Sequence, residues 1–206
     1  YHGIARGWDT AAEALANLEE VIQLEGPQTI AAFILETVTG TNGILIPPDG
    51  YIQGVREICT RNDILMVADE VMAGFGRTGR WFAIDNWDTV PDLMTMAKGL
   101  TSSYLPLGAV AMNHDIAKHF DSAFYFGGLT YSSHAVSCAA ALANISVYED
   151  DGLLDTLDDL RALRDLPGDV LRLEDVPVPT PTEDEILVRV SVCGTEIVSS
   201  TQRCVV

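Results

Sequence analysis

Two short apolar segments, each followed by a charged side chain, constrain most strongly what this chain can fold into. Residues 64–68 form a strand-like apolar run that ends at Asp69, and residues 93–97 form a second run that ends at Lys98. Short apolar runs of this kind are typical of buried strands. Because α/β sheets bind their ligands at the carboxyl ends of the strands, the pattern predicts an acid and an amine at one ligand-binding edge.

An acid and an amine at the same sheet edge suit the chemistry of pyridoxal phosphate (PLP). This cofactor needs a lysine amine that holds its aldehyde as a Schiff base and an acidic group that keeps its ring nitrogen protonated. Lys98 and Asp69 have the chemistry for these two roles. Taken alone, a lysine at the end of a strand is more often a surface residue, so the assignment depends on the surrounding sequence.

Four longer motifs surround these residues: ADEVMAGFGRTGRWFA from Ala68, PDLMTMAKGL from Pro91, LPLGAVAM from Leu105 and GGLTYSSH from Gly127. Together they resemble the cofactor-binding core of the class III (omega-amino acid) PLP-dependent aminotransferases. The separation of 29 residues between Asp69 and Lys98 (98 − 69) is also similar to that of the family. The resemblance covers about residues 8–155, and the motif sequences are most similar to those of the taurine:pyruvate and β-alanine:pyruvate branch.

The resemblance implies an α/β fold over residues 1–157, namely a partial fold-type I aminotransferase large domain with a mostly parallel sheet and flanking helices. The apolar patterns agree with this interpretation. They predict a helix at residues 10–23 and a buried strand at residues 29–35 that ends at Glu36. Residues 50–61 are interpreted as a helix that crosses back to the next strand, and residues 115–120 and 136–148 as two further helices. Because a helix crosses between two of the predicted strands, those strands are expected to be parallel.

The resemblance also implies roles for individual residues. Lys98 would form the Schiff base and carry the proton, and Asp69 would bond the ring nitrogen. Val71 would pack against one face of the ring, unless it is an ordinary core valine. Thr130 would bond the cofactor phosphate of the neighbouring subunit in a homodimer, or is simply a turn threonine. Glu36 would lie near the substrate entrance and pair with an arginine from a C-terminal part without counterpart here, or is a solvated strand end.

Residues 74–79 satisfy the pattern G-x-G-x-x-G, which raises the alternative of a dinucleotide-binding loop. Such a loop should leave its strand directly and open a helix of several turns. This segment instead begins five residues after Asp69 and runs into Arg80, Trp81 and Phe82 without a helical apolar period. The pattern therefore favours the loop that the aminotransferase family carries near its subunit interface.

Charge and cysteine content exclude several other classes of function. The 30 acidic and 12 basic side chains give a formal net charge of −18, which would repel nucleic acids and anionic membrane surfaces. No apolar run is long enough to cross a membrane, and no signal peptide is recognised. The cysteine pattern makes a reducing cytoplasm the expected location. The four cysteines, Cys59, Cys138, Cys193 and Cys204, form no C-x-x-C pair, which indicates neither a disulfide framework nor a metal site.

The aminotransferase resemblance stops after about residue 155. Residues 161–197 resemble instead the N-terminal start of medium-chain, zinc-dependent alcohol dehydrogenases. Residues 158–206 are therefore interpreted as a short β-rich tail that resembles an incomplete GroES-like domain. The cysteine that matches a catalytic zinc ligand is Cys193, and because a catalytic zinc needs about three protein ligands, no zinc is expected.

These observations favour a truncated aminotransferase that moves an amino group from an omega-amino acid or amine to an oxo acid such as pyruvate. Members of the family are considerably longer than 206 residues, so parts of the active site are expected to be missing. The alternative is an inactive fold fragment, or a chimeric gene product, that at most binds PLP or associates with full-length subunits. A zinc-dependent dehydrogenase fragment is a third interpretation and rests on the tail alone.

Overall fold

The computed structural model describes residues 11–155 and the backbone of two short strands near the C-terminus. The chain forms two compact units, Tyr1–Asp165 and Leu166–Val206. In the second unit, β5 (Glu185–Leu187) pairs antiparallel with β6 (Arg203–Val205). The domain boundary predicted between residues 157 and 158 and the predicted zinc-ligand match at Cys193 lie outside the described residues and stay predictions.

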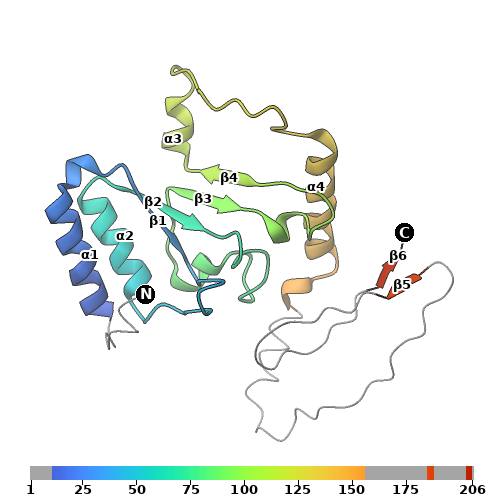
Figure 1. Ribbon diagram of the computed structural model, residues 1–206, viewed down its shortest axis with the longest axis horizontal. Helices are drawn as coiled ribbons and strands as arrows, with labels where there is room; N and C mark the ends of the chain where they lie inside the picture. Colours follow the sequence, from blue (N-terminus) through green and yellow to red (C-terminus); the bar gives the residue numbers. More distant parts are fainter. Residues whose placement is uncertain (1–10, 156–184, 188–202, 206) are drawn as a thin grey trace, which may run out of the picture. The chain divides into compact units, whose positions relative to one another are not determined.

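A four-stranded sheet organises the first unit (Figure 1). Its strands are β1 (Ala32–Glu36), β2 (Leu65–Asp69), β3 (Leu93–Met96) and β4 (Ala109–Met112), and they lie side by side in that order. The first three strands are parallel, and β4 joins β3 antiparallel. The expectation of a mostly parallel sheet is therefore confirmed.

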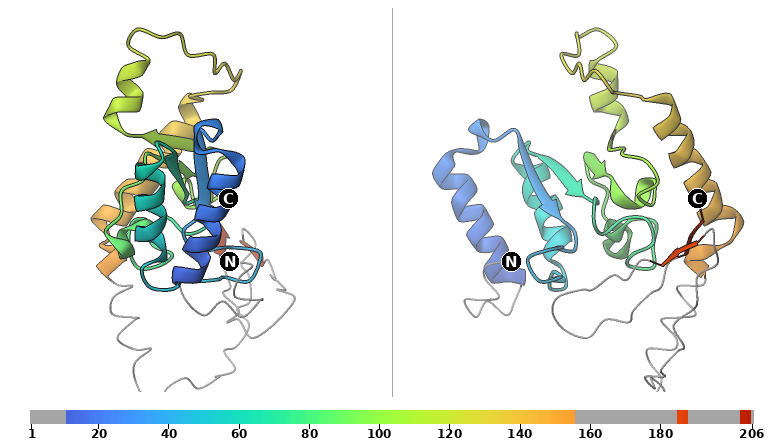
Figure 2. Two further views of the ribbon diagram at one scale, coloured as in Figure 1. Left: turned by 90° about the vertical axis from the view of Figure 1, so that its left-hand side faces the viewer. Right: turned by 45° about the vertical axis from the view of Figure 1, so that its right-hand side comes forward.

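Two helices cover one face of this sheet. Helix α1 (Ala11–Glu25) and helix α2 (Tyr51–Arg61) pack side by side, as both views in Figure 2 show. The core between them and the sheet includes Ile52, Val55 and Met66, all fully buried. Gly54 allows the two helices to approach closely, because a Cβ at this position would collide with Leu15.

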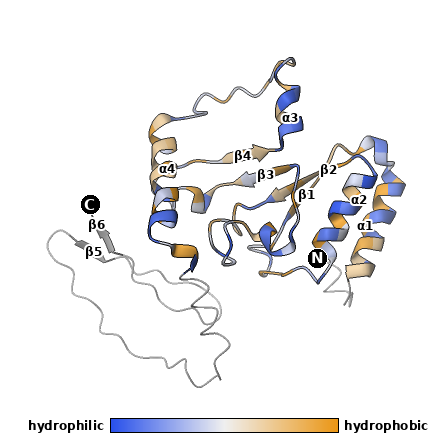
Figure 3. Ribbon diagram, turned by 180° about the vertical axis from the view of Figure 1, so that it is seen from behind, coloured by the Kyte–Doolittle hydropathy of each residue, from blue (hydrophilic) through white to orange (hydrophobic). Residues whose placement is uncertain are grey.

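The opposite face of the sheet carries exposed apolar side chains. Successive residues of a strand point to opposite faces, and the register places Ile34, Leu65, Val110 and Met112 on the face away from α1 and α2. Their exposed fractions are 61%, 38%, 56% and 40% in that order. Figure 3 shows the hydrophobic character of the strands seen from behind. We call these four residues the open face. Soluble domains normally cover an apolar surface of this kind.

The remaining elements lie at the ends of the strands. They are η2 (Pro27–Thr29), η3 (Ala83–Trp87), η4 (Lys98–Leu100), α3 (His114–His119) and α4 (Ala135–Asp150). Helix α4 packs against η4 through a small cluster formed by Phe75, Leu100 and Ala141. Within residues 11–155, no helix combines the length and the apolar character needed to cross a bilayer.

The predicted elements are all present, with shifted ends. The first strand begins at Ala32 rather than at residue 29, because Pro27 starts a short helical turn that includes Thr29. The second helix begins at Tyr51, after Gly50, which has a left-handed conformation (φ +80°). The strand predicted at residues 93–97 ends at Met96, just before the turn that contains Lys98.

Candidate active site

The sheet brings Asp69 and Lys98 to the same edge, as the sequence predicted. Asp69 is the last residue of β2 and lies opposite Thr95 in the neighbouring parallel strand β3. Lys98 follows two residues after the end of β3 and is the first residue of η4. Because β2 and β3 run in the same direction, both residues lie at the carboxyl edge, where α/β sheets place their ligands.

The Asp69 carboxylate is half-buried and held in one orientation. Its Oδ1 accepts the backbone N–H of Val71 at 2.9 Å. The paired residue Thr95 has a buried hydroxyl oxygen that finds no hydrogen-bond partner within the described residues. Buried polar atoms are nearly always satisfied, so an orphaned hydroxyl beside a carboxylate fits a site that takes a polar ligand.

The backbone at Lys98 is strained. Its φ of +42° lies in the left-handed region, which is uncommon for residues other than glycine, and its side chain is exposed. Strain of this kind persists only where the surrounding structure fixes it, and it occurs often at functional sites. Here a Cβ on the next residue, Gly99, would lie 2.6 Å from the Cβ of Phe75, so only glycine fits between Lys98 and the loop below.

A second group that contacts this turn is Asn144 of α4. Its side-chain Nδ2 donates to the carbonyl oxygens of Gly99 at 2.8 Å and Leu100 at 3.2 Å. The sequence did not single out Asn144, because nothing local distinguishes it from any other polar residue of a helix. Only the packing of α4 against η4 brings its amide to the Lys98 turn.

Glu70 is a buried acid that sequence reasoning also missed. Its carboxylate accepts the N–H groups of Ala83 and Ile84 at 2.9 and 2.8 Å and the hydroxyl of Thr37 at 2.9 Å. Burial raises the pKa of Glu70 above its ordinary value of 4.5, and these three hydrogen bonds lower it in part. The sequence does contain one indication of its burial. Glu70 directly follows Asp69, and because side chains alternate along a strand, the two acids are expected to point in opposite directions.

The glycine-rich segment forms a closed loop. Phe75 N–H donates to the Trp81 carbonyl at 2.7 Å, and Gly76 N–H donates to the Arg80 carbonyl at 3.1 Å. Phe75, Gly76 and Gly79 all have positive φ values. No helix of several turns opens in this loop, so the geometry differs from that of a dinucleotide-binding loop. A cavity of about 770 Å³ adjoins it, lined by Val38, Met72, Arg77 and Trp87 among others, and Asp69 and Lys98 do not line it.

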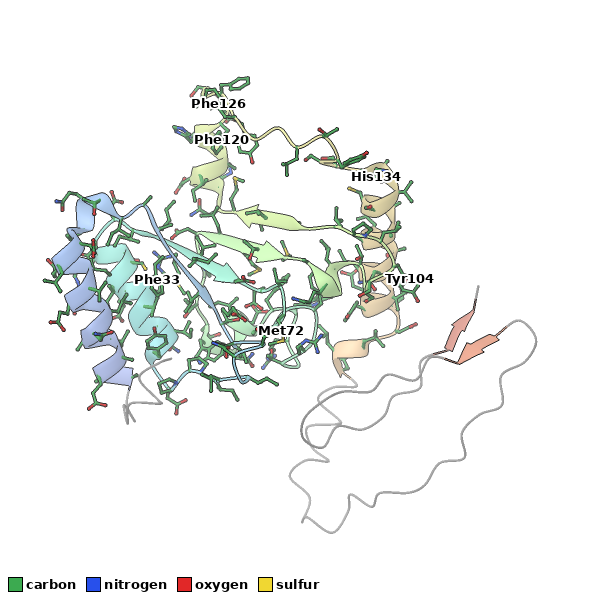
Figure 4. All side chains as sticks on the ribbon, viewed as in Figure 1. Phe33, Met72, Tyr104, Phe120, Phe126 and His134 are labelled. Carbon is green, nitrogen blue, oxygen red and sulfur yellow. The ribbon has the colours of Figure 1, made fainter. Side chains whose placement is uncertain are left out.

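The other predicted site residues lie at different distances from this edge. Glu36 ends β1 directly opposite Asp69, and its Oε2 accepts the Gly40 N–H at 2.7 Å. Val71 is half-buried just beyond Asp69. Thr130 is exposed in the connection between α3 and α4, which runs beyond the edge strand β4. Figure 4 shows Phe126 and His134 of this connection well separated from Met72 near the end of β2.

Comparisons with known proteins show which sequences this chain resembles. A sequence model described as "Aminotransferase class-III" matches residues 4–166. The chain is 47% identical over 143 residues to a diaminobutyrate–2-oxoglutarate transaminase from Halomonas elongata, covering 67% of this chain and 30% of the relative. It is 42% identical over 143 residues to a putrescine–pyruvate aminotransferase from Pseudomonas aeruginosa, covering 69% and 31%.

A solved structure extends the similarity to the fold. The taurine:2-oxoglutarate aminotransferase of Bifidobacterium kashiwanohense, in complex with PLP and glutamate, superposes with a TM-score of 0.73 at 42% identity. The superposition covers 75% of this chain and 34% of that structure. The chain thus spans about a third of the length of the relatives that it matches.

Proposed function

Because the chain belongs to the class-III aminotransferases, a PLP-dependent family, we propose that it provides the cofactor-binding core of an enzyme that transfers an amino group to an oxo acid. The observation that carries the proposal is the placement of Asp69 and Lys98 at the carboxyl edge of adjacent parallel strands. An acid, an amine and an orphaned hydroxyl at this edge are groups that fit the ring and aldehyde of PLP.

Asp69 is the residue that we assign to the cofactor ring. A carboxylate beside the ring nitrogen keeps that nitrogen protonated, and bound PLP then supplies an electron sink for the amine under reaction. The hydrogen bond from Val71 N–H holds one carboxylate oxygen in place, and this also defines the position of the second oxygen. Val71 itself follows on the same strand end, where we place it against one face of the ring.

Lys98 is the residue that we assign to the covalent bond with the cofactor aldehyde. Once the amino donor displaces it, its free amine holds and moves the proton at the donor carbon that carries the nitrogen. The exposed side chain and the strained turn are consistent with an amine that must be presented to a ligand rather than paired within the fold.

We place Glu36 and Thr130 at the borders of the site. Glu36 lies opposite Asp69 in register, at the same edge, where it can meet the substrate. Thr130 lies on the exposed connection beyond β4, a position that suits contact with the phosphate of a neighbouring subunit. We therefore propose a homodimer in which the connection from one subunit reaches the site of the other.

The proposed substrates are a donor with a terminal amine and an oxo acid acceptor. The support comes from the relatives, whose names include putrescine–pyruvate and taurine:2-oxoglutarate aminotransferases. An omega-amino acid or amine as donor and pyruvate as one acceptor agree with these names. We propose the cytoplasm as the compartment, on the basis of the cysteine pattern.

A second candidate function is that of a fold fragment that binds the cofactor or other subunits without turnover. The open face favours it, because four apolar residues of the sheet lie exposed within a chain that spans a third of its relatives. This second function shares binding with the first and lacks turnover.

The composition of the chain allows a sharp test, because Lys98 and Lys118 are its two lysines. The purified chain is incubated with PLP at a substoichiometric ratio, treated with borohydride and digested, and the modified peptides are mapped. We expect the label at Lys98, with the exposed Lys118 of α3 as internal control. Equal labelling of both lysines would refute a cofactor site.

The same experiment separates the two candidate functions. The Lys98→Arg variant should lose the label and the visible absorbance of the bound cofactor, and the Lys118→Arg variant should keep both. Addition of an amine donor to the loaded chain should then change this absorbance, and an oxo acid should restore it, if the chain turns over. Specific labelling without a spectral response to any donor supports the inactive fragment.

A further inference from the structure

The strained turn at Lys98 is stabilised by few contacts. Two hydrogen bonds lie within the turn, from Leu100 N–H to the Ala97 carbonyl at 2.9 Å and from Thr101 N–H to the Lys98 carbonyl at 3.2 Å. Bonds of this kind close any short helical turn and do not select a left-handed first residue. A restraint on Lys98 must therefore come from outside the turn.

Phe75 supplies one such restraint from the glycine-rich loop. Its Cβ lies so close to Gly99 that the turn has no room to move toward the loop. The ring of Phe75 also packs edge-on against Phe82, with the ring centres 5.6 Å apart. This restraint is steric, so it limits the position of the turn but does not hold the orientation of its peptide groups.

Asn144 supplies the restraint on orientation. Its amide group donates to two consecutive carbonyl oxygens, of Gly99 and Leu100, from a helix 45 residues further along the chain. Two hydrogen bonds from one planar group fix the directions of both peptide planes. The same two planes carry the N–H groups of Leu100 and Thr101, which donate to the carbonyls of Ala97 and Lys98. Those two carbonyls belong to the peptide planes on either side of the Lys98 Cα, so the hold on orientation reaches the torsion angles of Lys98 through these hydrogen bonds.

The surroundings of Asn144 indicate that its amide serves this contact. Ala141, one turn earlier, is buried against Phe75 and Leu100, and Tyr148, one turn later, lies against Trp81 with ring centres 5.6 Å apart. Asn144 thus lies between two residues of α4 that pack in an apolar cluster. A half-buried amide in such surroundings is costly unless it forms hydrogen bonds, so the two carbonyls are its natural partners.

We propose that Asn144 is a positioning residue for Lys98, because its amide holds the Gly99 and Leu100 carbonyls and thereby fixes the left-handed turn that presents the lysine amine. The inference rests on the cofactor role proposed for Lys98. Both hydrogen bonds of the Asn144 amide go to backbone carbonyls, so it acts through the geometry of the turn.

The test compares Asn144→Leu, which keeps the size and removes both donors, and Asn144→Asp, which keeps the shape and turns a carboxylate toward the carbonyls. The control is Asn17→Leu, at an exposed position of α1. The first measurement is amide hydrogen exchange without cofactor, followed at Leu100 and Thr101 and, for comparison, at Met66 in β2. We expect exchange in the turn to rise about tenfold in both Asn144 variants and to stay unchanged at Met66.

The second measurement is the ratio of PLP label at Lys98 to label at Lys118 in the same variants. We expect this ratio to fall about tenfold in the Asn144 variants and to remain at the original value in Asn17→Leu. Unchanged exchange in the turn would overturn the proposal, and so would an equal rise at Met66, because it indicates a general loss of stability. A third outcome is also informative: exchange in the turn rises in the Asn144 variants, but Lys98 takes no label even in the original chain. This outcome supports the restraint by Asn144 and refutes the proposed function.

Discussion

The carboxylate of Glu70 accepts the backbone N–H of Ile84 at 2.8 Å, which ties the end of β2 to the first turn of η3. The same carboxylate takes the N–H of Ala83 and the hydroxyl of Thr37, so three segments meet at one buried acid. This acid directly follows Asp69 and points to the opposite face of the strand. The residue that anchors the strand end and the residue proposed to meet the cofactor are therefore neighbours with separate tasks.

Replacing Glu70 should destabilise the fold strongly. In Glu70→Gln one acceptor oxygen becomes an amide donor, which faces N–H groups that need an acceptor. Loss of hydrogen bonds at a fully buried site costs about 2–4 kcal/mol of unfolding free energy. Urea unfolding measures this loss, and Glu57→Gln on the exposed side of α2 is the control, with a change within about 0.5 kcal/mol. Equal unfolding midpoints for Glu70→Gln and the original chain would contradict the anchoring role.

The stabilising effect of Glu70 should depend on pH in a defined direction. Its pKa in the folded chain is raised above 4.5 by burial, so between the unfolded and folded pKa values the folded state binds more protons. The contribution of Glu70 to the unfolding free energy is therefore fully present below the pKa that Glu70 has in the unfolded chain. It is lost as the pH rises through the pKa of the folded chain.

Glu70→Gln lacks this titration, so it isolates the effect. The difference in unfolding free energy between the original chain and Glu70→Gln should be larger near pH 5 than near pH 8. Urea unfolding of both chains over this pH range measures the difference. A difference that shrinks on acidification would show that the pKa of Glu70 is lowered rather than raised.

The sequence predicted the parts of this fold that depend on local pattern. The apolar runs before Asp69 and Lys98 have the length and composition of strands, and the structure places them as adjacent parallel strands. The helix at residues 11–25 follows from apolar spacing in the same way, and the helix at residues 51–61 follows from its place between two strands. The acid and the amine at one sheet edge could therefore be predicted without information on contacts between distant segments.

Contacts between distant segments explain what the sequence did not predict. Glu70 is an acid in the core, where hydropathy alone would never place one, and its partners lie 13, 14 and 33 residues away. The partners of Asn144 lie 44 and 45 residues away. Each of these features depends on tertiary packing that overrides local preference.

The open face should make the isolated chain bind apolar dyes and associate with itself. Replacing Ile34 and Val110 by threonine keeps β-branched side chains in the strands but removes exposed apolar surface. The double variant should show weaker dye fluorescence and less association in sedimentation experiments, with an unfolding free energy within about 1 kcal/mol of the original. Met66→Thr on the buried face is the matched control and should unfold the chain. Dye binding that does not change in the double variant would place the apolar surface elsewhere.

The close contact between Gly99 and Phe75 gives a prediction at the lysine turn itself. In Gly99→Ala the new methyl group would lie 2.6 Å from the Cβ of Phe75, so the turn or the loop must shift. Crowding of this kind costs about 1–3 kcal/mol, and the shift should also lower the PLP label at Lys98 relative to Lys118. Gly128→Ala is the control, because a Cβ there meets no atom within 4 Å. If Gly99→Ala loses stability but keeps the original labelling ratio, the contact serves the fold alone and does not position the lysine.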